Sequence, residues 1–453
     1  MSTRQLLILN GLVCDPANGI YKKADVLVEN GKIVKIGKIN NPQFISTVSR
    51  SKTSRLGQSI DGSQVIDATG KIVVPGLIDI HTHLREPGHS DEETIASGTK
   101  AASVGGFTTI FAMPNTHPPV DSVTGVKFVL MTAMHEGIVN VLPVGAITKG
   151  QKGEELAEIG KMKNAGVVAI SDDGKSVMNA NIMRRALEYS KMFDLPVISH
   201  CEDINLTKDG EMNEGYISTV LGLKGIPRQA EEIMVARDIA LAELTGGKLH
   251  IAHVSTAQSV ELIRNAKKKG IKVTAETAPH YFSLTDEEIK NRDYDTNYKI
   301  NPPLRTEDDI KAICEGIADD TIDCIASDHA PHLDEEKQQE FRVAPFGIIG
   351  LETTLPLVIT KLVDKKVLTL SQAIEKLASN PAKIFNLNKG ILSAGSDADI
   401  TIIDLEQEKK IEKFESKSKN SPFIGMVLTG FATTTIVSGK IVMCNGQIIT
   451  TNK

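Results

Sequence analysis

The sequence predicts an α/β protein in which a (β/α)8 TIM barrel carries a small β-sandwich domain built from both termini. Three observations lead to this fold class. Eight short runs rich in β-branched residues alternate with helical patterns between Lys71 and Lys366. These runs are almost continuously apolar, as is typical of parallel strands covered on both faces. The two ends of the chain instead contain short alternating strands separated by turn signals, and they resemble each other.

The eight strand runs favour closure into a barrel, because repeated strand and helix units pair in parallel. Several of the helical patterns end on the glycine expected just beyond a helix C-terminus, as in 154–166 and 257–270. An eighth helical pattern follows the last strand run, at 351–366. A doubly wound open sheet is the runner-up, but no GxGxxG follows the first run. The strand runs are 72–83, 106–115, 139–148, 167–173, 195–202, 248–255, 271–280 and 321–329.

The two terminal segments are expected to form one domain, with the barrel inserted between them. Residues 1–74 and 390–453 would make the β-sandwich, and residues 75–389 the barrel. The short strands at both ends alternate apolar and polar residues, which is typical of antiparallel sheets with one solvated face. The polar, Ser-rich stretch Asn40 to Ser63 is interpreted as a loop within the small domain.

Composition excludes several classes of protein. A net charge of −6 gives no basic footprint for nucleic acid. The five cysteines are scattered and form no CxxC pair, which argues against disulfides and thiolate zinc sites and favours a reducing cytoplasm. No apolar stretch approaches the length of about 20 residues that spans a membrane. The sequence therefore predicts a cytoplasmic protein that acts on a small molecule, with no membrane and no nucleic acid as partner.

Polar residues stand at the C-terminal ends of the strand runs, the face where such barrels carry their active sites. His81 and His83 are two apart on a strand, so both imidazoles face the same side and can bind one metal ion. The polar residues, in strand order, are His81 and His83, Asn115, Asp172 and Asp173, His200, His253, His280, and Asp328.

These residues are more than one tetrahedral metal ion needs. Imidazole and carboxylate ligands without cysteine suit zinc, and manganese or cobalt can replace it. Four of the histidines, Asp328 and one bridging carboxylate would satisfy two ions about 3.5 to 4 Å apart that share a hydroxide. Strand four must then supply the bridge, and strand alternation alone permits either Asp172 or Asp173.

Several runs of residues carry a resemblance to a known family. The runs are DIHTHLREPG (79–88), AMPNTHPPV (112–120), SDDG (171–174), HCED (200–203), HVST (253–256), NYKINPPLR (297–305), ASDHAPH (326–332) and APFG (344–347). Together they resemble the signature runs of class I dihydroorotase, in the cyclic amidohydrolase superfamily of metallo-dependent hydrolases, over nearly the whole chain. HTHLREPG and SDHAPH alone indicate only the superfamily, whereas MPNT, NPPLR and APFG narrow the resemblance to the dihydroorotase family.

The resemblance implies two zinc ions per subunit, bridged by Asp173 and a hydroxide, and leaves Asp172 to shape the turn. Hydantoinases, dihydropyrimidinases and allantoinases instead bridge their metals with a carbamylated lysine on strand four. No lysine lies in VVAISDD (167–173), which favours the aspartate bridge. The implied ligands are His81, His83 and Asp173 for one ion and Asp173, His200 and His253 for the other, with Asp328 near the first.

The substrate implied by the resemblance, dihydroorotate, is a cyclic ureide with a carboxylate. Arg85 offers the planar fork that a carboxylate needs. The other implied substrate contacts are His83 and Asn115 beside the metals, Asn301 and the backbone of Phe346 and Gly347 at the ureide edges, and His332 at the carboxylate. His332 lies on the charged loop 330–347, whose composition suits a mobile cover and equally a solvated loop.

The implied reaction is the reversible hydrolysis of (S)-dihydroorotate to N-carbamoyl-L-aspartate. Its reverse, ring closure, would be the third step of de novo pyrimidine (UMP) biosynthesis. A hydroxide would attack the ring amide, and Asp328 would take its proton and deliver it to the departing ring nitrogen. Asp328 is thus the implied catalytic residue. Among the remaining histidines, His280 and His329 could orient ligands, whereas His135 and His250 are interpreted as structural.

Two alternatives stay open at this point. Another cyclic amidohydrolase, such as allantoinase or a hydantoinase, would turn over allantoin or hydantoin, although Arg85 and Asn115 favour a substrate with a carboxylate. An inactive dihydroorotase-like partner of aspartate transcarbamoylase would have lost metal ligands, and all six positions are intact. A homodimer and a complex with aspartate transcarbamoylase are both compatible with the sequence.

Overall fold

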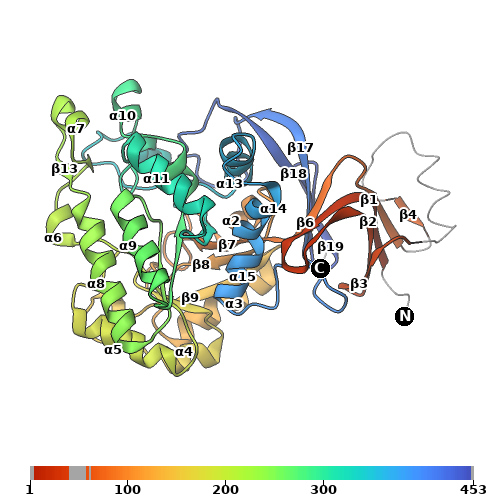
Figure 1. Ribbon diagram of the computed structural model, residues 1–453, viewed down its shortest axis with the longest axis horizontal. Coiled ribbons are helices and arrows are strands. Elements are labelled where there is room, and N and C mark those ends of the chain that lie inside the picture. Colours follow the sequence, from red (N-terminus) through yellow and green to blue (C-terminus); the bar gives the residue numbers. More distant parts are fainter. Residues whose placement is uncertain (1–4, 40–57, 61–62, 450–453) are drawn as a thin grey trace.

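The computed structural model describes residues 5–39, 58–60 and 63–449 of the chain. A barrel of strands ringed by helices stands beside a β-rich domain that combines red and blue strands from the two ends of the sequence (Figure 1). Among the helices of the described residues, none is long and apolar enough to cross a membrane. All five cysteines have free thiols.

Eight parallel strands form the barrel, in sequential order around the sheet. A parallel bridge between Thr82 and His329 joins the first strand to the end of the last, and His83 N donates to His329 O at 2.8 Å. The predicted (β/α)8 fold is therefore confirmed. The strands are β7 (Leu77–Thr82), β8 (Phe107–Ala112), β9 (Asn140–Gly145), β10 (Ala169–Ser171), β11 (Val197–Ser199), β14 (Leu249–Ile251), β15 (Val273–Thr277) and β16 (Cys324–Ile325).

A helix follows each barrel strand on the outside of the ring. Local sequence sets the helix ends: Thr94 accepts from Ser97 N as an N-cap, and Gly246 ends its helix in the left-handed conformation. The last helix continues as the π-helix η5 (Ile359–Val363). The helices are α2 (Ile95–Val104), α3 (Val123–Glu136), α4 (Ile159–Ala165), α5 (Ala180–Lys191), α8 (Gln229–Thr245), α9 (Ala257–Lys268), α11 (Glu307–Ala318) and α13 (Thr354–Val358).

Short elements fill the longer connections. Four of them lie between β15 and α13, in connections that leave the C-terminal ends of the last two barrel strands. The short elements are η2 (Lys149–Gln151), α6 (Ile204–Thr207), β12 (Met212–Asn213), α7 (Tyr216–Leu221), β13 (Gly225–Ile226), η3 (Pro279–Phe282), α10 (Glu287–Asn291), η4 (Thr296–Tyr298), α12 (Asp334–Lys337), α14 (Leu370–Ile374), η6 (Glu375–Ser379) and α15 (Asn380–Ile384).

The inside of the barrel is apolar at one end and polar at the other. Inward side chains from the strands pack with Phe385, which follows α15, and the Phe111 and Phe385 rings meet edge to face at 4.8 Å. This packing closes the N-terminal end of the barrel. Buried histidines and carboxylates line the C-terminal end, so the fold places these polar side chains where a ligand can reach them.

The terminal domain combines strands from both ends of the chain in one hydrogen-bonded network. Apolar residues of both ends, such as Ile8, Val26, Ile402 and Ile436, pack into a single cluster, as expected for a sandwich. Its strands are β1 (Gln5–Asp15), β2 (Ile20–Glu29), β3 (Lys32–Gly37), β4 (Gln58–Ile60), β5 (Ser63–Asp67), β6 (Ile72–Pro75), β17 (Ile400–Lys410), β18 (Val427–Val437), β19 (Lys440–Cys444) and β20 (Gln447–Ile448), with the turn η1 (Pro16–Asn18).

Two expectations about this domain need correction. The run 72–83 is two strands, because β6 pairs with β1 and β17 in the terminal sheet and only β7 enters the barrel. Gly76 divides them where the chain passes close to Thr108, and a Cβ at Gly76 would lie 2.1 Å from Thr108 Oγ1.

The stretch Asn40 to Ser63 was expected to be a loop, but β4 lies within it and pairs antiparallel with β5. Backbone pairing along the edge of β5 gives this polar run a strand conformation despite its composition. Residues 40–57 and 61–62 lie outside the described residues.

Candidate metal centre

The candidate site lies at the C-terminal ends of the barrel strands. His81 is in β7 and His83 follows it, and both imidazoles are buried on the same side. His253 and Asp328 have φ values of +34° and +49°, in the left-handed region that is uncommon for residues other than glycine. Such strained backbone is concentrated at functional sites, where it aims side chains that a regular strand would not.

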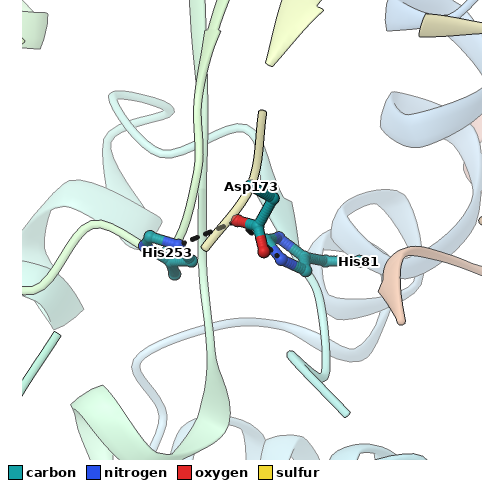
Figure 2. A group of neighbouring side chains, drawn as sticks. All are labelled: His81, Asp173 and His253. Carbon is teal, nitrogen blue, oxygen red and sulfur yellow. Dashed lines mark ion pairs between the residues drawn. The ribbon is translucent and has the colours of Figure 1, made fainter. Parts of the chain in front are cut away.

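Asp173, just after β10, lies at the centre of the histidines. Its Oδ1 is 3.3 Å from His81 Nε2 and 3.5 Å from His253 Nε2. The same oxygen is 3.5 Å from His200 Nδ1, and Oδ2 is 3.5 Å from His83 Nε2. Figure 2 shows His81 and His253 on opposite sides of the carboxylate. The Asp173 carboxylate thus faces two pairs of imidazoles, His81 with His83 and His200 with His253.

Asp328 completes a second group on the side of His81 and His83. Its Oδ1 lies 3.5 Å from the Nε2 atoms of both histidines. On the other side, His200 Nδ1 and His253 Nε2 are 2.8 Å apart. Potential ligand atoms come together in two groups, His81 with Asp173 and His253, and His81 with His83 and Asp328.

The residues fit a metal ion. A tetrahedral ion with bonds of about 2.0 to 2.1 Å holds its ligand atoms about 3.3 Å apart, and the nitrogen to oxygen distances are 3.3 to 3.5 Å. Among the described residues, His81 Nε2 and Asp173 Oδ1 are buried without a hydrogen-bond partner. Buried polar atoms are rarely left unpaired, so these two atoms point to a ligand between them.

Electrostatics also favour a cation at this position. Burial alone would lower the pKa of His81, but the carboxylates of Asp173 and Glu276 raise it well above its usual value. Burial would raise the pKa of Asp173, and the surrounding imidazoles hold it well below its usual range. The group therefore stabilises positive charge, which a bound metal ion would supply.

Glu276 of β15 is a functional residue that sequence analysis missed. Its Oε1 lies 2.5 Å from His81 Nδ1 and its Oε2 lies 3.1 Å from His250 Nε2. Burial would raise the pKa of Glu276, but His81 and His250 lower it to about 2. The contact fixes the ring of His81 with Nε2 toward the site. A carboxylate in an otherwise apolar strand run was the available signal.

His250 is therefore part of this support, since it holds the second oxygen of Glu276. His280 and His329 are the histidines expected to orient ligands. In the described residues, neither side chain forms a hydrogen bond or an ion pair with the side chain of a proposed ligand. His329 instead contacts Glu93 Oε2 at 3.3 Å, and His280 is buried with Nε2 unpaired, its pKa lowered by burial to about 4. His135 lies on the exposed side of α3.

Glu202 is a second residue that sequence analysis left without a role. Its Oε2 lies 2.7 Å from His200 Nε2, so His200 presents Nδ1 to Asp173. Asn301 Nδ2 donates to the same Glu202 oxygen at 3.1 Å. Burial would lower the pKa of His200, but Asp173 and Glu202 raise it to about 10. Asn301 is thereby brought beside the metal ligands.

Asn115 and Arg85 lie next to the first histidine pair. His83 Nδ1 and Asn115 Oδ1 are 2.8 Å apart, which turns His83 Nε2 toward Asp173 and leaves the Asn115 amide free to donate. Arg85 Nε donates to Pro331 O at 3.0 Å and lies 2.9 Å from Glu92 Oε2. These contacts fix the guanidinium at the rim of the site.

The loop with His332 is anchored by buried groups. His332 Nε2 lies 2.8 Å from Phe346 O, and 3.3 Å from Arg85 Nη2. Lys337 is 7% exposed and its Nζ donates to Gly347 O at 3.0 Å, while Gly347 N donates to Lys299 O at 3.0 Å. The structure thus brings His332, Phe346 and Gly347 together with Arg85, and Lys337 and the Lys299 carbonyl hold the end of the charged loop.

The neighbouring aspartates of strand four have different partners. Asp172 accepts from Ile147 N at 2.8 Å and Thr148 N at 3.1 Å, and it also accepts from the Thr148 hydroxyl. Burial raises the pKa of Asp172 to about 6. Asp172 fixes the turn after β9, whereas Asp173 faces the imidazoles.

Comparison with known proteins gives strong matches. A family model described as "Dihydro-orotase-like" matches residues 70–259, and one described as "Urease alpha-subunit, N-terminal domain" matches residues 2–59. The chain is 57% identical to a dihydroorotase of Endomicrobium trichonymphae over 95% of this chain and 97% of that protein. It is 54% identical to a dihydroorotase of Acetivibrio thermocellus over 97% and 99%.

Solved structures with similar folds include hydantoinases. The L-hydantoinase (dihydropyrimidinase) from Arthrobacter aurescens superposes with a TM-score of 0.85 at 27% identity, covering 98% of this chain and 97% of that one. A D-hydantoinase from Thermus sp. gives a TM-score of 0.80 at 24% identity, over 98% and 97%. The barrel and the β-sandwich beside it are thus shared with these enzymes at about half the identity of the sequence relatives.

Proposed function

Because the chain belongs to the dihydroorotase family, we propose that its buried histidine and aspartate group is a two-zinc centre that opens and closes the dihydroorotate ring. The chain is an enzyme with dihydroorotase activity, since relatives of that name match nearly its full length at 57% and 54% identity. Allantoinase, hydantoinase and an inactive partner protein are not favoured. The finer assignments below are proposals.

The donor set supports two zinc ions bridged by Asp173 and a hydroxide. Asp173 faces imidazoles on both sides, at distances that match those between the ligand atoms of a tetrahedral metal ion. Nitrogen and oxygen donors without cysteine suit zinc. Strand four carries Asp173 and no lysine between 167 and 173, so the bridge would be an aspartate. The proposed ligands are His81, His83 and Asp173 for one ion, Asp173, His200 and His253 for the other, and Asp328 near the first.

The substrate carboxylate is proposed to bind Arg85, Asn115 and His332. Arg85 has donors beyond those used by Pro331 and Glu92, and the Asn115 amide is free to donate once its oxygen holds His83. Burial lowers the pKa of His332 to about 2, so its ring is neutral and has a single N–H. Nε2 holds this proton and donates it to Phe346 O at 2.8 Å, so the ring would redirect it to the substrate carboxylate on binding. His83, Asn301 and the backbone of Phe346 and Gly347 would complete the pocket around the ring.

The ring amide bond breaks as a new carbon to oxygen bond forms. Zinc ions, when bound, make hydroxide available near neutral pH and polarise a carbonyl oxygen. Asp328 is proposed to take the proton of the nucleophile and to deliver it to the departing ring nitrogen. Burial would raise the pKa of Asp328, but His81 and His83 hold it well below its usual range, so the carboxylate is ionised and can accept. Run backwards, the same transfers close N-carbamoyl-L-aspartate into the ring.

The cellular setting is proposed from this chemistry. Ring closure would serve as the third step of de novo pyrimidine synthesis in the cytoplasm. A homodimer and a complex with aspartate transcarbamoylase are the assemblies to test, by light scattering and by co-purification.

We also propose that 1–74 with 390–453, and 75–389, are the two domains, since Gly76 separates a strand of the terminal sheet from one of the barrel.

Two variants of adjacent aspartates test the centre. Metal-free protein should regain dihydroorotate hydrolysis as zinc is added, up to two equivalents, and should not hydrolyse allantoin or hydantoin. Asp173→Asn should bind fewer than two zinc ions and lose turnover, because the shared carboxylate is gone. Asp172→Asn is the matched control, because the Asp172 side chain holds the turn at Ile147 and Thr148 and contacts no proposed ligand in the described residues, so this variant should keep both ions. Retention of two zinc ions by Asp173→Asn would exclude the bridge.

A further inference from the structure

A segment of the terminal domain crosses the barrel at the rim of the site. Residues 411–426, which we call the strap, leave the sheet after β17 and return at β18. Backbone hydrogen bonds from Ile411 N to Met426 O at 2.9 Å and from Gly425 N to Ile411 O at 2.8 Å close its base. Phe423 in the strap packs in one apolar cluster with Tyr298 and Phe341 from the barrel loops. The strap is therefore a packed element.

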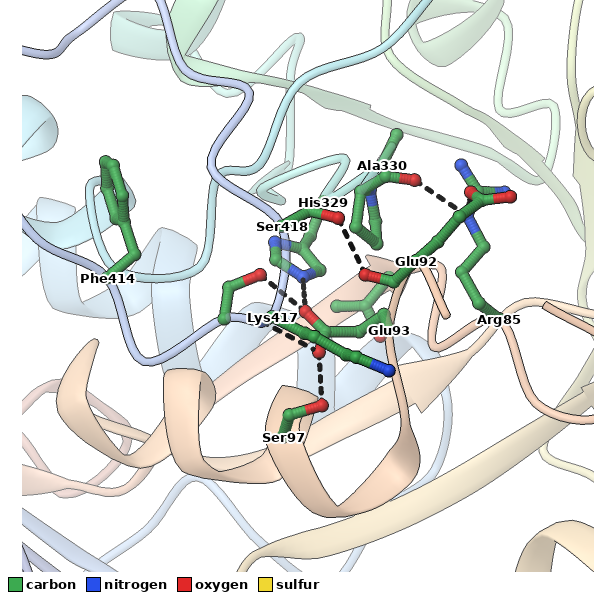
Figure 3. A network of polar contacts seen from close by, with 12 residues as sticks. Arg85, Glu92, Glu93, Ser97, His329, Ala330, Phe414, Lys417 and Ser418 are labelled. Carbon is green, nitrogen blue, oxygen red and sulfur yellow. Dashed lines mark hydrogen bonds and ion pairs between the residues drawn. The ribbon is translucent and has the colours of Figure 1, made fainter. Parts of the chain in front are cut away.

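The strap holds the loop that carries Arg85. Ser418 Oγ donates to Glu92 O at 2.7 Å, and Lys417 N donates to Glu93 Oε1 at 3.2 Å. Figure 3 shows the strap residues Lys417 and Ser418 beside Glu92 and Glu93, with His329 also next to Glu93. Glu92 in turn lies 2.9 Å from Arg85 Nε. The strap is thus connected to the guanidinium through Glu92.

Asn420 in the strap holds two further loops at once. Its Nδ2 donates to Ala330 O at 3.0 Å and to Gly347 O at 3.1 Å, and its Oδ1 accepts from His332 N at 3.2 Å. Its own carbonyl accepts from Ile349 N at 2.9 Å. Asn420 is 3% exposed. Every polar group of this side chain is therefore committed to backbone atoms of the 330–332 and 347–349 segments.

We infer that Asn420 is a positioning residue for substrate: from the terminal domain, it fixes the backbone on which His332 and the 346–347 peptide meet the ring. This inference rests on the proposed role of those residues in binding dihydroorotate. Asn420 contacts no metal ligand side chain in the described residues, so it acts on substrate binding and leaves the zinc centre unchanged. The strap makes the terminal domain part of the binding site.

Loss of the amide should show first in substrate binding. Without Asn420, Ala330 O and His332 N lose the side-chain partner that holds them and Gly347 O keeps only Lys337 Nζ, so the loops must be ordered when substrate arrives. We expect Asn420→Ala to raise KM for dihydroorotate about tenfold, equivalent to about 1.4 kcal/mol, with kcat changed less than twofold and zinc content unchanged. Hydrogen exchange of peptides covering 329–350 should become about tenfold faster, in metal-free and zinc-loaded protein alike.

Asn140 offers a matched control at the opposite end of the barrel. Its Nδ2 also joins the barrel to the terminal domain, through Thr108 O at 2.8 Å and Asp399 Oδ2 at 3.1 Å. Asn140→Ala should cost stability but leave KM and the exchange of 329–350 unchanged. Equal changes in both variants would mean that Asn420 is merely structural, and an unchanged KM and unchanged exchange in Asn420→Ala would overturn the inference.

A second variant covers the case in which Asn420→Ala does not fold. Asn420→Asp keeps the size of the side chain and the acceptor for His332 N, but at pH 8 it turns a carboxylate toward the carbonyl oxygens of Ala330 and Gly347. It should raise KM at least as much, and a wild-type KM would overturn the inference. If the wild-type chain does not hydrolyse dihydroorotate, the proposed function fails, and the exchange of 329–350 still decides whether Asn420 fixes these loops.

Discussion

Replacing Glu276 by glutamine tests whether the outer contact of His81 controls metal binding. Glu276 is 1% exposed, and its oxygens reach His81 Nδ1 at 2.5 Å and His250 Nε2 at 3.1 Å. Glutamine keeps the length of the side chain and a carbonyl oxygen for the His81 N–H. It removes the negative charge that fixes the tautomer of His81 and makes its Nε2 a stronger ligand.

The size of the effect follows from the contact with His81. A hydrogen bond to a charged group contributes about 1.5 to 3 kcal/mol, roughly twice the value for neutral partners. Exchanging Glu276 for a neutral amide therefore removes about 1 to 1.5 kcal/mol from the support of His81, which lowers zinc affinity about tenfold. This lies at the lower end of the 10 to 100-fold losses typical of such outer partners.

Competition with a chromophoric chelator measures the zinc Kd of the variant, and circular dichroism checks that it folds. Glu211→Gln is the matched control, because Glu211 is also buried and holds Lys224 N and Arg342 Nε far from the histidines. An unchanged zinc Kd in Glu276→Gln, or an equal loss in Glu211→Gln, would refute the reasoning.

Three further predictions concern single side chains. Arg85→Ala should raise KM for dihydroorotate about 10 to 100-fold, the worth of a charge-assisted contact, with zinc content unchanged; loss of zinc would make Arg85 structural. Asp328→Asn should fold, by circular dichroism, and lower kcat about 10² to 10⁴-fold, whereas an active variant would exclude it as the proton carrier. Burial lowers the pKa of Lys337 from 10.5 to about 7, so between these pH values the unfolded chain binds the proton that the folded chain releases. The free energy of unfolding should therefore rise with pH in that range, by up to about 1.4 kcal/mol per pH unit. Lys337→Met should flatten the rise measured by urea unfolding, and parallel slopes would contradict it.

The fold was accessible from sequence because its signal is local. Apolar runs predicted the eight barrel strands, and polar residues at their ends, such as His81 and Asp328, predicted one shared rim. The boundary at Gly76 was missed because Ile72–Pro75 and Leu77–Thr82 form a nearly continuous apolar run, which cannot tell which sheet each half joins.

The residues that hold the site in place, such as Glu276 and Asn420, depend on which segments become neighbours in space. Local sequence patterns do not encode those neighbours. Glu276 reaches His81 across the barrel from a strand 195 residues later in the chain. Asn420 lies in a polar run that resembles a surface loop, and only the excursion between β17 and β18 brings it to Gly347. Alternation could not separate Asp172 from Asp173, whose different partners, a turn and the imidazoles, appear only in three dimensions.

The pairing of β6 with β17 determines when the chain can complete its fold during synthesis. Val73 and Val74 of β6 find their antiparallel partners in Ile402 and Thr401, 329 and 327 residues later (402 − 73 and 401 − 74). At about 5 to 20 residues per second, a ribosome needs about 16 to 65 s to supply them. During that interval β6 has an unpaired edge, and the strap has not yet emerged. The enzyme can mature only when β17, the strap and β18 have left the ribosome, so nascent chains stalled within the barrel would be inactive and open to aggregation or to chaperones.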